Sequence, residues 1–413
     1  MHIPPAVVLS NHVTGLWVSR ALAGRSVPVS VMPVGSSCLA RYSRRVDRRY
    51  PIHRGGVDAL ADRLLNGGEV PEGSVLVPTG DLELEALSRH REALARRYRL
   101  CVPSWSATRV LLRKNETARV AGELGIPTPQ NHGPPEGLDG RDLRYPVVLK
   151  PNDSAAFQRH FGRKLFVAQS PQEFRAFAER IGSAGVGSQV QDLIPGPDSL
   201  SFNDTAYYDR QGRRVAGLAI RKLRKSPPFF GIGRVVERSG DPEVDRRMRE
   251  HVDDFVRRAA WHGPVSAEFK LDPRDGRLVL IEVNGRCSFV HQLAWRCGLD
   301  YAWMQFQESC ERQPESGPPR EGRASLIHLH ADLLNALFFR RVERLPLADL
   351  VRPYRGRRHF AVWSLGDPWP FFVEWLRTAR DVPGLLTSRS ARAELTGRAV
   401  TIREPCHSSG TRA

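Results

Sequence analysis

The sequence predicts an α/β and α+β fold, in which a parallel-sheet domain precedes a larger mixed domain and a small C-terminal extension. Short apolar strands alternate with helical segments over the first hundred residues, and this order is typical of a parallel sheet covered by helices. Two strands joined by a tight turn near residue 275 indicate an antiparallel hairpin. The length of 413 residues, with 41% hydrophobic and 26% charged residues, fits two or three globular domains.

The first domain, assigned to residues 1–110, carries three apolar strands and three helices. The predicted strands are 6–10, 27–33 and 74–78, and the predicted helices are 15–24, 58–65 and 83–97. Gly24 ends the first helix and Asp81 caps the last. This order is Rossmann-like, but Gly15 and Gly24 do not form a Gly-x-Gly-x-x-Gly motif, so no dinucleotide site is predicted.

The second domain, assigned to residues 111–320, contains helices and strands separated by segments rich in Pro and Gly. The predicted helices are 111–124, 171–181 and 241–261, and the predicted strands are 145–150, 187–194, 201–208, 215–221 and two around 265–283. We divide this domain into lobes of about 111–195 and 196–320. Residues 311–324 read as a linker or surface loop, 321–400 as a C-terminal extension and 401–413 as a disordered tail.

The charge excludes few partners but favours anionic ones. The formal net charge is +17, and only six of the 62 basic residues are lysines. Because arginine is spread along the whole chain, a bias on solvated faces explains the excess better than a nucleic-acid site, which stays an alternative. Nucleotide phosphates would also be attracted. Six cysteines without a Cys-x-x-Cys pair argue against zinc ribbons and disulfide scaffolds.

No transmembrane segment is predicted, because no uncharged stretch approaches the ~18 residues that a membrane-spanning helix needs. The N-terminus lacks a basic head followed by an apolar run and a cleavage site. We therefore expect a cytoplasmic protein.

The most informative stretch is the hairpin over residues 265–286. A three-residue turn ending at Gly276 sets Glu268 opposite Glu282, and strand alternation places Asn284 on the same face as Glu282. Two opposed carboxylates repel each other, so we expect something cationic between them. This all-oxygen set suits Mg²⁺ or Mn²⁺, with a nucleotide phosphate as co-ligand. An incidental pair on a solvated strand face is the alternative.

Several cationic and polar residues precede this hairpin. Lys150 ends an apolar strand, Lys114 begins a helix, and a cationic cluster over 221–225 follows a further strand. The strand 189–194, stopped by Pro-Gly-Pro, offers backbone groups for an adenine edge, and Asp198 lies beyond it. Taken singly, Lys114 and Lys150 are each more often a lysine with a buried stem than a ligand, and the cluster over 221–225 is more often a solvated basic run.

The order of these segments resembles the ATP-grasp superfamily of carboxylate–amine ligases. The resemblance runs over roughly residues 1–310 and is most specific at IEVNGR (281–286). It implies an N-terminal domain followed by a two-lobed ATP-grasp domain. No Gly-rich loop follows Lys150, which resembles the branch of D-aspartate ligase and other amino-acid ligases and makes Lys164 a candidate participant.

The resemblance also implies roles for individual residues. Lys114 and Lys150 would hold the α- and β-phosphates of ATP, and Lys222 would approach the γ-phosphate. The Gln191 side chain and the backbone of Asp192 and Ile194 would meet adenine, with Asp198 on the ribose. Glu268, Glu282 and Asn284 would hold two Mg²⁺ ions, for which Mn²⁺ is a substitute, and Arg286 would stabilise the phosphoryl group and the acyl phosphate.

These roles predict an ATP-dependent ligase that joins a small-molecule carboxylate, of an amino acid or small peptide, to an amine. The reaction would pass through an acyl phosphate and release ADP and phosphate. Two alternatives stay open, namely a nucleotide-binding regulatory protein with a degenerate grasp and a ligase whose acceptor is a thiol or a carrier protein. A homodimer is also considered. The sequence does not identify the substrates or the base that deprotonates the amine.

Four further features lie outside the set of residues to which the resemblance gives a role. His291 is a candidate base by proximity only, and a structural or substrate-contacting role is favoured. His328 and His330 are expected on one strand face, and without a third ligand a packed or surface pair is favoured over a metal site. The aromatic, amphipathic pattern of residues 371–376 favours packing in the core over a dimer face or a membrane-surface helix. For Cys287, a packed position in the interior is favoured over a role as nucleophile.

Overall fold

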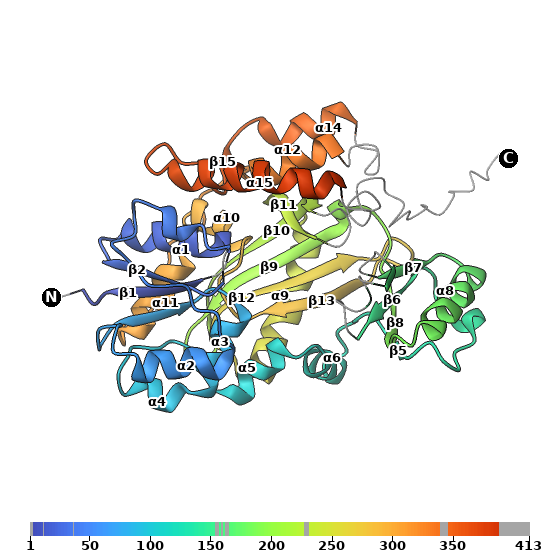
Figure 1. Cartoon of the computed structure of the whole chain (residues 1–413), viewed down its shortest axis with the longest axis horizontal. Helices are drawn as coiled ribbons and strands as arrows, with labels where there is room; N and C mark the ends of the chain where they lie inside the picture. Colours follow the sequence, from blue (N-terminus) through green and yellow to red (C-terminus); the bar gives the residue numbers. More distant parts are fainter. Residues whose placement is uncertain are drawn as a thin grey trace.

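The computed structural model describes residues 3–10, 12–35, 37–152, 157, 160–161, 165–226, 231–338 and 346–387. These residues form a four-stranded parallel sheet, a seven-stranded sheet and a four-stranded antiparallel sheet. Figure 1 shows the parallel sheet on the left, the seven-stranded sheet in the centre and the small antiparallel sheet on the right. The predicted parallel sheet at the N-terminus and the mixed α/β character are therefore confirmed.

The N-terminal sheet has the strand order β3-β2-β1-β4. Its strands are β1 (Ala6–Ser10), β2 (Val29–Pro33), β3 (Arg48–Arg49) and β4 (Val75–Pro78), and its helices are α1 (Val13–Ala23), α2 (Val57–Asn66), α3 (Asp81–Arg89) and α4 (Arg91–Ala95). The helix predicted over 83–97 is two helices, because the backbone of His90 leaves the helical region. Gly80 rather than Asp81 occupies the cap position of α3.

Two helices connect this sheet to the small one. The single helix predicted over 111–124 is instead α5 (Trp105–Leu112) and α6 (Lys114–Glu123), because Arg113 between them has an extended backbone. Lys114 begins the second helix, as predicted.

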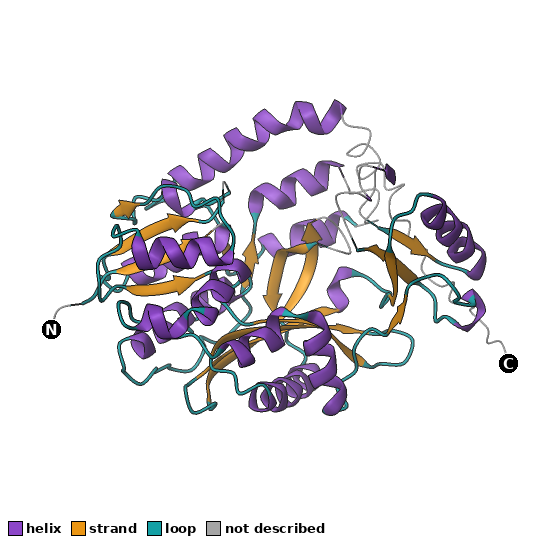
Figure 2. Cartoon of the chain, turned by 60° about the horizontal axis from the view of Figure 1, so that its bottom comes forward, coloured by secondary structure: helices purple, strands orange, loops and turns teal. Residues whose placement is uncertain are grey.

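The small sheet has the order β5-β8-β6-β7 and its own core. Its strands are β5 (Asn131–Gly133), β6 (Val147–Pro151), β7 (Phe166–Ala168) and β8 (Ser188–Asp192), with helix α8 (Pro171–Ser183) beside them. Phe166 and Phe174 are buried between this helix and the sheet. In Figures 1 and 2 this lobe projects from the rest of the molecule.

The large sheet has the order β13-β12-β9-β10-β11-β14-β15. Its strands are β9 (Ser201–Tyr208), β10 (Arg214–Ser226), β11 (Ile232–Arg238), β12 (Gly263–Leu271), β13 (Leu278–Asn284), β14 (Ser325–Ile327) and β15 (Arg358–Phe360). The sequence did not reveal β11, and β10 continues past the predicted end at residue 221, so Lys222 and Lys225 lie on the strand. Residues beyond 321 add β14 and β15 to this same sheet.

The remaining helices surround the large sheet. They are α9 (Pro242–Arg258), α10 (His291–Arg296), α11 (Tyr301–Ser309), α12 (Leu329–Phe338), α14 (Leu347–Val351) and α15 (Trp369–Thr387), with short 3-10 turns elsewhere. Helix α9 begins after the capping side chain of Asp241, lies against β9 and β13, and buries Met248 and Phe255 in the core that they share. Figure 1 shows α12, α14 and α15 together above β10 and β11.

One hydrophobic core joins the N-terminal sheet to the large sheet. Trp17 of α1 belongs to the same buried cluster as Tyr207 of β9, Leu293 of α10 and Leu326 of β14. The indole of Trp17 also donates a hydrogen bond to the Ser288 carbonyl at 3.2 Å. The parallel sheet and α1 therefore share a buried core with the large sheet.

The hairpin that carries the predicted carboxylates forms with a β-bulge. Near the turn, Leu271 pairs with Leu278, which is one residue out of the predicted register. A register shift between Phe269 and Glu268 then restores it, so that Glu268 pairs with Glu282 as predicted. Gly276 closes the turn with a φ of 71°, which glycine adopts without strain.

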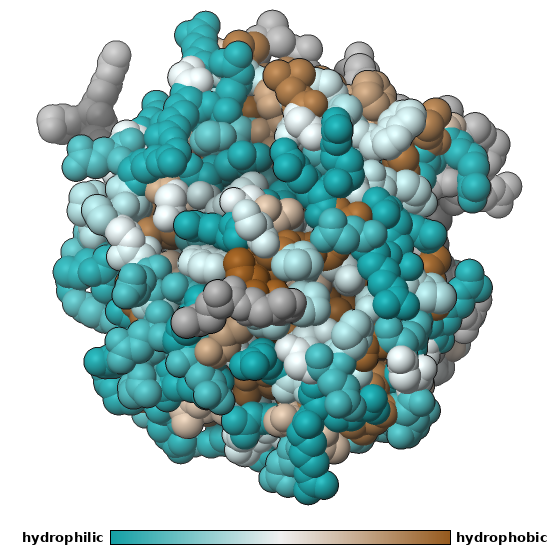
Figure 3. All heavy atoms as spheres, turned by 90° about the vertical axis from the view of Figure 1, so that its left-hand side faces the viewer, coloured by the Kyte–Doolittle hydropathy of each residue, from teal (hydrophilic) through white to brown (hydrophobic). Residues whose placement is uncertain are grey.

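The surface agrees with the charge analysis. Figure 3 shows that hydrophilic side chains cover most of the face at the N-terminal end, with small hydrophobic groups between them.

Cys38, Cys101, Cys287, Cys297 and Cys310 are all free thiols, so none of these five joins a disulfide. Within the described ranges, no helix combines the length and the apolar character that crossing a membrane requires.

Gly285 provides a test of this packing, because a side-chain methyl group there would overlap the ring of Trp261 and lie 2.9 Å from Leu111 Cδ2. We expect Gly285→Ala to lower the free energy of unfolding by about 1–3 kcal/mol, measured by urea denaturation. Gly182→Ala, at an open position of helix α8, is the matched control and should be neutral or slightly stabilising. Equal effects of the two substitutions would contradict the packing argument.

Candidate active site

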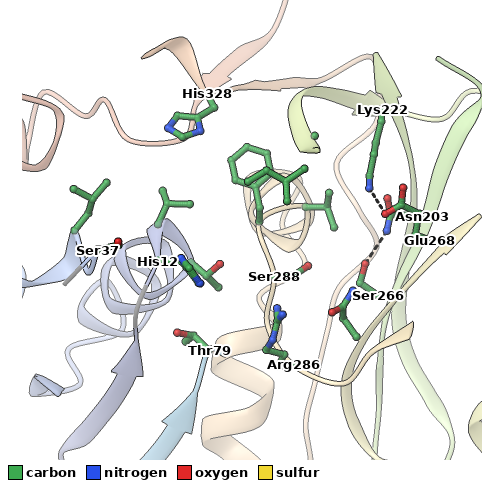
Figure 4. A pocket seen from close by; sticks show the side chains of 18 of the residues that line it. His12, Ser37, Thr79, Asn203, Lys222, Ser266, Glu268, Arg286, Ser288 and His328 are labelled. Carbon is green, nitrogen blue, oxygen red and sulfur yellow. Dashed lines mark hydrogen bonds and ion pairs between the residues drawn. The ribbon is translucent and has the colours of Figure 1, made fainter. Parts of the chain in front are cut away.

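A cavity of about 470 Å³ lies where the N-terminal sheet, the large sheet and the C-terminal helices meet (Figure 4). Its walls come from the carboxyl edge of the parallel sheet, from strands β9, β10, β12 and β13, and from the region of β14 and α15. Residues that line it include His12, Ser37, Thr79, Asn203, Lys222, Glu268, Glu282, Asn284, Arg286, His328 and Glu374. The predicted metal and phosphoryl residues thus share one cavity.

Glu268 is buried and paired with two lysines. Its side chain accepts a hydrogen bond from Lys222 Nζ and another from Lys225 Nζ, the latter at 3.0 Å. Burial alone would raise the pKa of Glu268, but the two ammonium groups outweigh burial and hold that pKa at about 2. Two lysine side chains of β10 therefore supply positive charge to Glu268, and a metal between the two carboxylates stays a prediction.

Glu282, in contrast, is exposed on the outermost strand of the sheet. The Asn284 side-chain amide donates a hydrogen bond to Glu282 Oε1 at 3.0 Å, which brings the two predicted ligands together. Strand alternation therefore places them on one face, as the sequence indicated.

Asn203 of β9 adds a feature that the sequence did not reveal. It is the cross-strand neighbour of Glu268, and its amide nitrogen donates to Ser266 Oγ at 3.0 Å. Its Oδ1 is buried and has no hydrogen-bond partner, which is unfavourable unless a cation or donor approaches. An unsatisfied amide oxygen beside two carboxylates and Asn284 Oδ1 forms a donor set that fits Mg²⁺.

Arg286 is held by the N-terminal domain. Its Nε donates to Asp81 Oδ1 at 2.7 Å, and its side chain is mostly buried at the cavity wall. Asp81 is the first residue of α3, so the helix N-terminus and this ion pair occur at one place. The sequence suggested only a capping role for Asp81, because a contact over 205 residues leaves no local signal.

Three residues of the N-terminal domain were also missed. His12, Ser37 and Thr79 line the cavity, and they follow strands β1, β2 and β4. Figure 4 shows them opposite Lys222 and Glu268. Ligands of open α/β sheets bind beyond the carboxyl ends of the strands, so the strand ends themselves were the available signal.

Of the predicted nucleotide residues, Lys114 begins helix α6 and Lys222 lies on β10, and the others lie on the small sheet and the segment that leaves it. Lys150 Nζ donates to the Gln191 side-chain oxygen, which joins β6 to β8. Burial, assisted by the charge of Lys114, lowers the pKa of Lys150 to about 8. Ile194 is buried, and Asp192 Oδ1 lies 2.8 Å from His132 Nε2. Lys164 lies outside the described residues.

Asp198 is engaged within the protein. Its carboxylate accepts the backbone N–H of Lys225 at 2.8 Å and is largely buried. This contact ties the segment after β8 to the strand that carries Lys222 and Lys225. The ribose contact proposed for Asp198 stays a prediction.

Comparison with known proteins gives two relatives by sequence. A protein named D-aspartate ligase from Enterococcus faecium (strain Aus0004) is 28% identical over 230 residues, covering 52% of this chain and 54% of the relative. A protein named D-alanine–D-alanine ligase from Acidiphilium cryptum (strain JF-5) is 22% identical over 228 residues, covering 49% and 69%. The predicted resemblance to the ATP-grasp ligases is confirmed. The chain spans about half the length of the first relative, and no family model matches it.

Solved structures with the same fold include an amino acid ligase and a biotin carboxylase domain. The L-amino acid ligase of Bacillus licheniformis superimposes with a TM-score of 0.57 at 16% identity, covering 75% of this chain and 74% of that one. The biotin carboxylase domain of the Hydrogenobacter thermophilus 2-oxoglutarate carboxylase, in complex with MgADP, ADP and bicarbonate, gives 0.58 at 16% identity, covering 78% and 74%. At such identities these matches establish the fold alone.

The remaining interpretations have mixed outcomes. His291 is fully buried, and its two ring nitrogens contact the Val265 carbonyl and the Ser288 N–H, so the structural role is confirmed. Burial lowers its pKa to about 4. Cys287 is buried, as predicted. Helix α15 packs Phe371 against the core but leaves Trp369, Phe372 and Leu376 exposed.

The expected strand position of the two histidines is wrong. Strand β14 ends at Ile327 and helix α12 begins at Leu329, so His328 precedes the helix and His330 lies in its first turn.

The ion pairs of Glu268 predict a specific pH dependence of stability. Since the folded-state pKa of about 2 lies below the usual value of 4.5, the stabilisation is present above about pH 4.5 and is lost as the pH falls towards 2. We expect Glu268→Gln to lower the free energy of unfolding at pH 7. The difference in this free energy between the variant and the wild type should be smaller in acid, and urea denaturation at neutral and at acidic pH measures it. Glu250→Gln, on the exposed face of α9, is the control. A Glu268→Gln effect that grows in acid would contradict the assignment.

Proposed function

We propose that this chain is an ATP-dependent carboxylate–amine ligase that acts on an amino acid or small peptide. It would form an amide bond through an acyl phosphate and release ADP and phosphate. The observation that carries the proposal is the cavity that Lys222, Glu268, Glu282, Asn284 and Arg286 share. The relatives named D-aspartate ligase and D-alanine–D-alanine ligase support amino-acid substrates.

The chemistry explains why such a cavity needs both signs of charge. A carboxylate is a poor acyl donor because oxide would have to leave, whereas phosphorylation converts that oxygen into a good leaving group. The phosphoryl group carries negative charge that must be neutralised while donor and acceptor are held in line. Arg286, whose position is set by Asp81, is suited to stabilise this charge at the cavity wall.

Glu268, Glu282 and Asn284 would hold Mg²⁺, with a second ion and Mn²⁺ substitution as finer proposals. Bound Mg²⁺ would neutralise phosphate charge and orient the transferred group. Lys222 and Lys225 already share the Glu268 carboxylate, so a ligand phosphate would compete with that carboxylate for the ammonium groups. The Lys222 side chain would therefore contact Glu268 when no nucleotide is bound and the γ-phosphate when ATP is bound.

The nucleotide would extend from this cavity to the small sheet. We propose Lys114 and Lys150 for the α- and β-phosphates, and Gln191, Asp192 and Ile194 for adenine. Asp198 would contact the ribose, in competition with its bond to the Lys225 N–H. The domain boundaries stay proposals too, with residues 1–110 before the grasp domain at 111–320 and the extension at 321–400.

The decisive test is ADP release across amino acids, offered singly and in pairs, with mass spectrometry of the product. We expect Glu282→Gln to abolish turnover, by at least about 100-fold, because a carboxylate ligand to the metal is lost. Its fold should be intact, since Glu282 is exposed. Glu250→Gln again serves as the control and should turn over normally.

Near-normal activity of Glu282→Gln would contradict the metal assignment. ATP binding without substrate-stimulated ADP release in the wild type would favour the regulatory alternative. A product that contains a thioester would identify a thiol acceptor in place of an amine.

The lowered pKa of Lys150 predicts how nucleotide binding depends on pH. As the pH rises through about 8, Lys150 loses its positive charge, and the affinity for ATP should fall. An arginine keeps its charge over this range, so the affinity of the Lys150→Arg variant for ATP should change less between about pH 7 and about pH 9. Calorimetric titration with ATP measures the affinity of the wild type and of the variant. Identical pH profiles of the two proteins would argue against a phosphate contact by Lys150.

A further inference from the structure

Two clusters of side chains in the described residues have the composition of a metal site. One consists of Cys101, His262 and Glu308, and the other of His328, His330 and Glu374. Within each cluster the candidate ligand atoms lie within 4.8 Å of one another. Neither cluster includes a residue of the proposed Mg²⁺ site.

The first cluster is explained by hydrogen bonds alone. Glu308 accepts hydrogen bonds from Tyr207, from the Cys101 thiol and from the backbone N–H of Arg210. Burial raises the pKa of Cys101, which keeps the thiol protonated and able to donate. With its carboxylate fully used inside the protein, this cluster has no need of an ion.

The second cluster brings together three separate segments. His328 follows β14, His330 lies in the first turn of α12, and Glu374 is on α15. His328 Nε2 lies 2.7 Å from Glu374 Oε1, and His330 Nδ1 lies 4.0 Å from the same oxygen. Two imidazoles and one carboxylate that face one another are a common ligand set for Zn²⁺.

Thr378 contacts the far nitrogen of His330. The Thr378 hydroxyl oxygen lies 3.2 Å from the Glu374 carbonyl oxygen and 2.5 Å from His330 Nε2. In the tautomer in which Nε2 carries the proton, Nε2 donates to Thr378, and the lone pair of Nδ1 is available to an ion beside Glu374. A hydrogen bond that orients a histidine from its far nitrogen is typical of metal ligands.

Glu374 also lacks a full set of partners. Its Oε2 is buried without a hydrogen bond, and in the described ranges only the two histidines pair with it. Arg377, one turn further along α15, instead donates to the Tyr42 hydroxyl. A buried carboxylate oxygen without a donor is unfavourable, and a bound cation would remove that cost.

The cluster opens to the cavity described above, because His328, Glu374 and Thr378 are among its lining residues. Figure 4 shows His328 on the side of the cavity away from Arg286 and Thr79. An ion bound here would keep a coordination position for water or a ligand in the cavity. Catalytic zinc sites have this open form, whereas structural zinc sites are closed by four protein ligands.

We propose that His328, His330 and Glu374 bind a divalent transition-metal ion, with Zn²⁺ as the best match, and leave one coordination position open to the cavity. The two imidazole nitrogens distinguish this site from the all-oxygen set of Glu268, Glu282 and Asn284, which suits Mg²⁺. The ion would also fasten α12 and α15 to the end of β14. This proposal does not depend on the ligase reaction.

The test uses Co²⁺ as a spectroscopic substitute. The full chain is freed of metal with a chelator, supplied with excess Mg²⁺ to fill the oxygen site, and titrated with Co²⁺ while visible absorption is recorded. We expect one equivalent to bind and Zn²⁺ to displace it, because two His and one Glu with an open fourth position are a ligand set typical of Zn²⁺. His330→Gln, which keeps a donor for Thr378, and Glu374→Gln should each weaken binding at least about tenfold.

Two further variants complete the design. Glu282→Gln should titrate like the wild type, since it alters only the oxygen site. Thr378→Val leaves all three ligands in place and should weaken binding about 10- to 100-fold by releasing the ring of His330, which keeps the test valid if His330→Gln fails to fold. No binding at one equivalent, or binding that the His330, Glu374 and Thr378 variants leave unchanged, would overturn the proposal.

Discussion

The opposition of two carboxylates across neighbouring strands is the constraint on which this structure depends. Glu268 and Glu282 pair across β12 and β13, and like charges at such positions repel unless cations intervene. Lys222 and Lys225 on β10 provide those cations for Glu268, and this requires β10 to continue past the point where its apolar pattern ends. The sheet therefore concentrates charge of both signs at one end of the cavity.

Backbone features hold this arrangement in place. The bulge beside Glu268 shifts the register by one residue, so that the two carboxylates face each other although the turn begins out of step. Gly285 then lets the chain pass against Trp261 between Asn284 and Arg286. Arg286 in turn reaches Asp81 in the N-terminal domain. The motif IEVNGR thus combines the predicted ligand residues Glu282 and Asn284 with a packing residue and a contact to helix α3.

The C-terminal segment contributes to the large sheet and to the cavity, and its sequence did not predict either contribution. Strands β14 and β15 extend the large sheet, and α15 places Glu374 and Arg377 at the cavity. Residues of the C-terminal segment therefore line the same cavity as Glu268 and Arg286. His328 and His330 lacked a third partner in the sequence because Glu374 lies 46 residues after His328 and pairs with it only in the folded chain.

The sequence alone determined the N-terminal α/β order, the hairpin with its paired carboxylates, and the lysines that precede it, because alternation, turn residues and short spacings are local properties. It also indicated the ATP-grasp resemblance. Only the tertiary structure decided the bulge, the Lys222 and Lys225 pairs, the bond of Arg286 to Asp81, and the cavity residues His12, Asn203 and Glu374. These contacts join segments far apart in the chain, and the packing of sheets and helices, rather than any local pattern, brings them together.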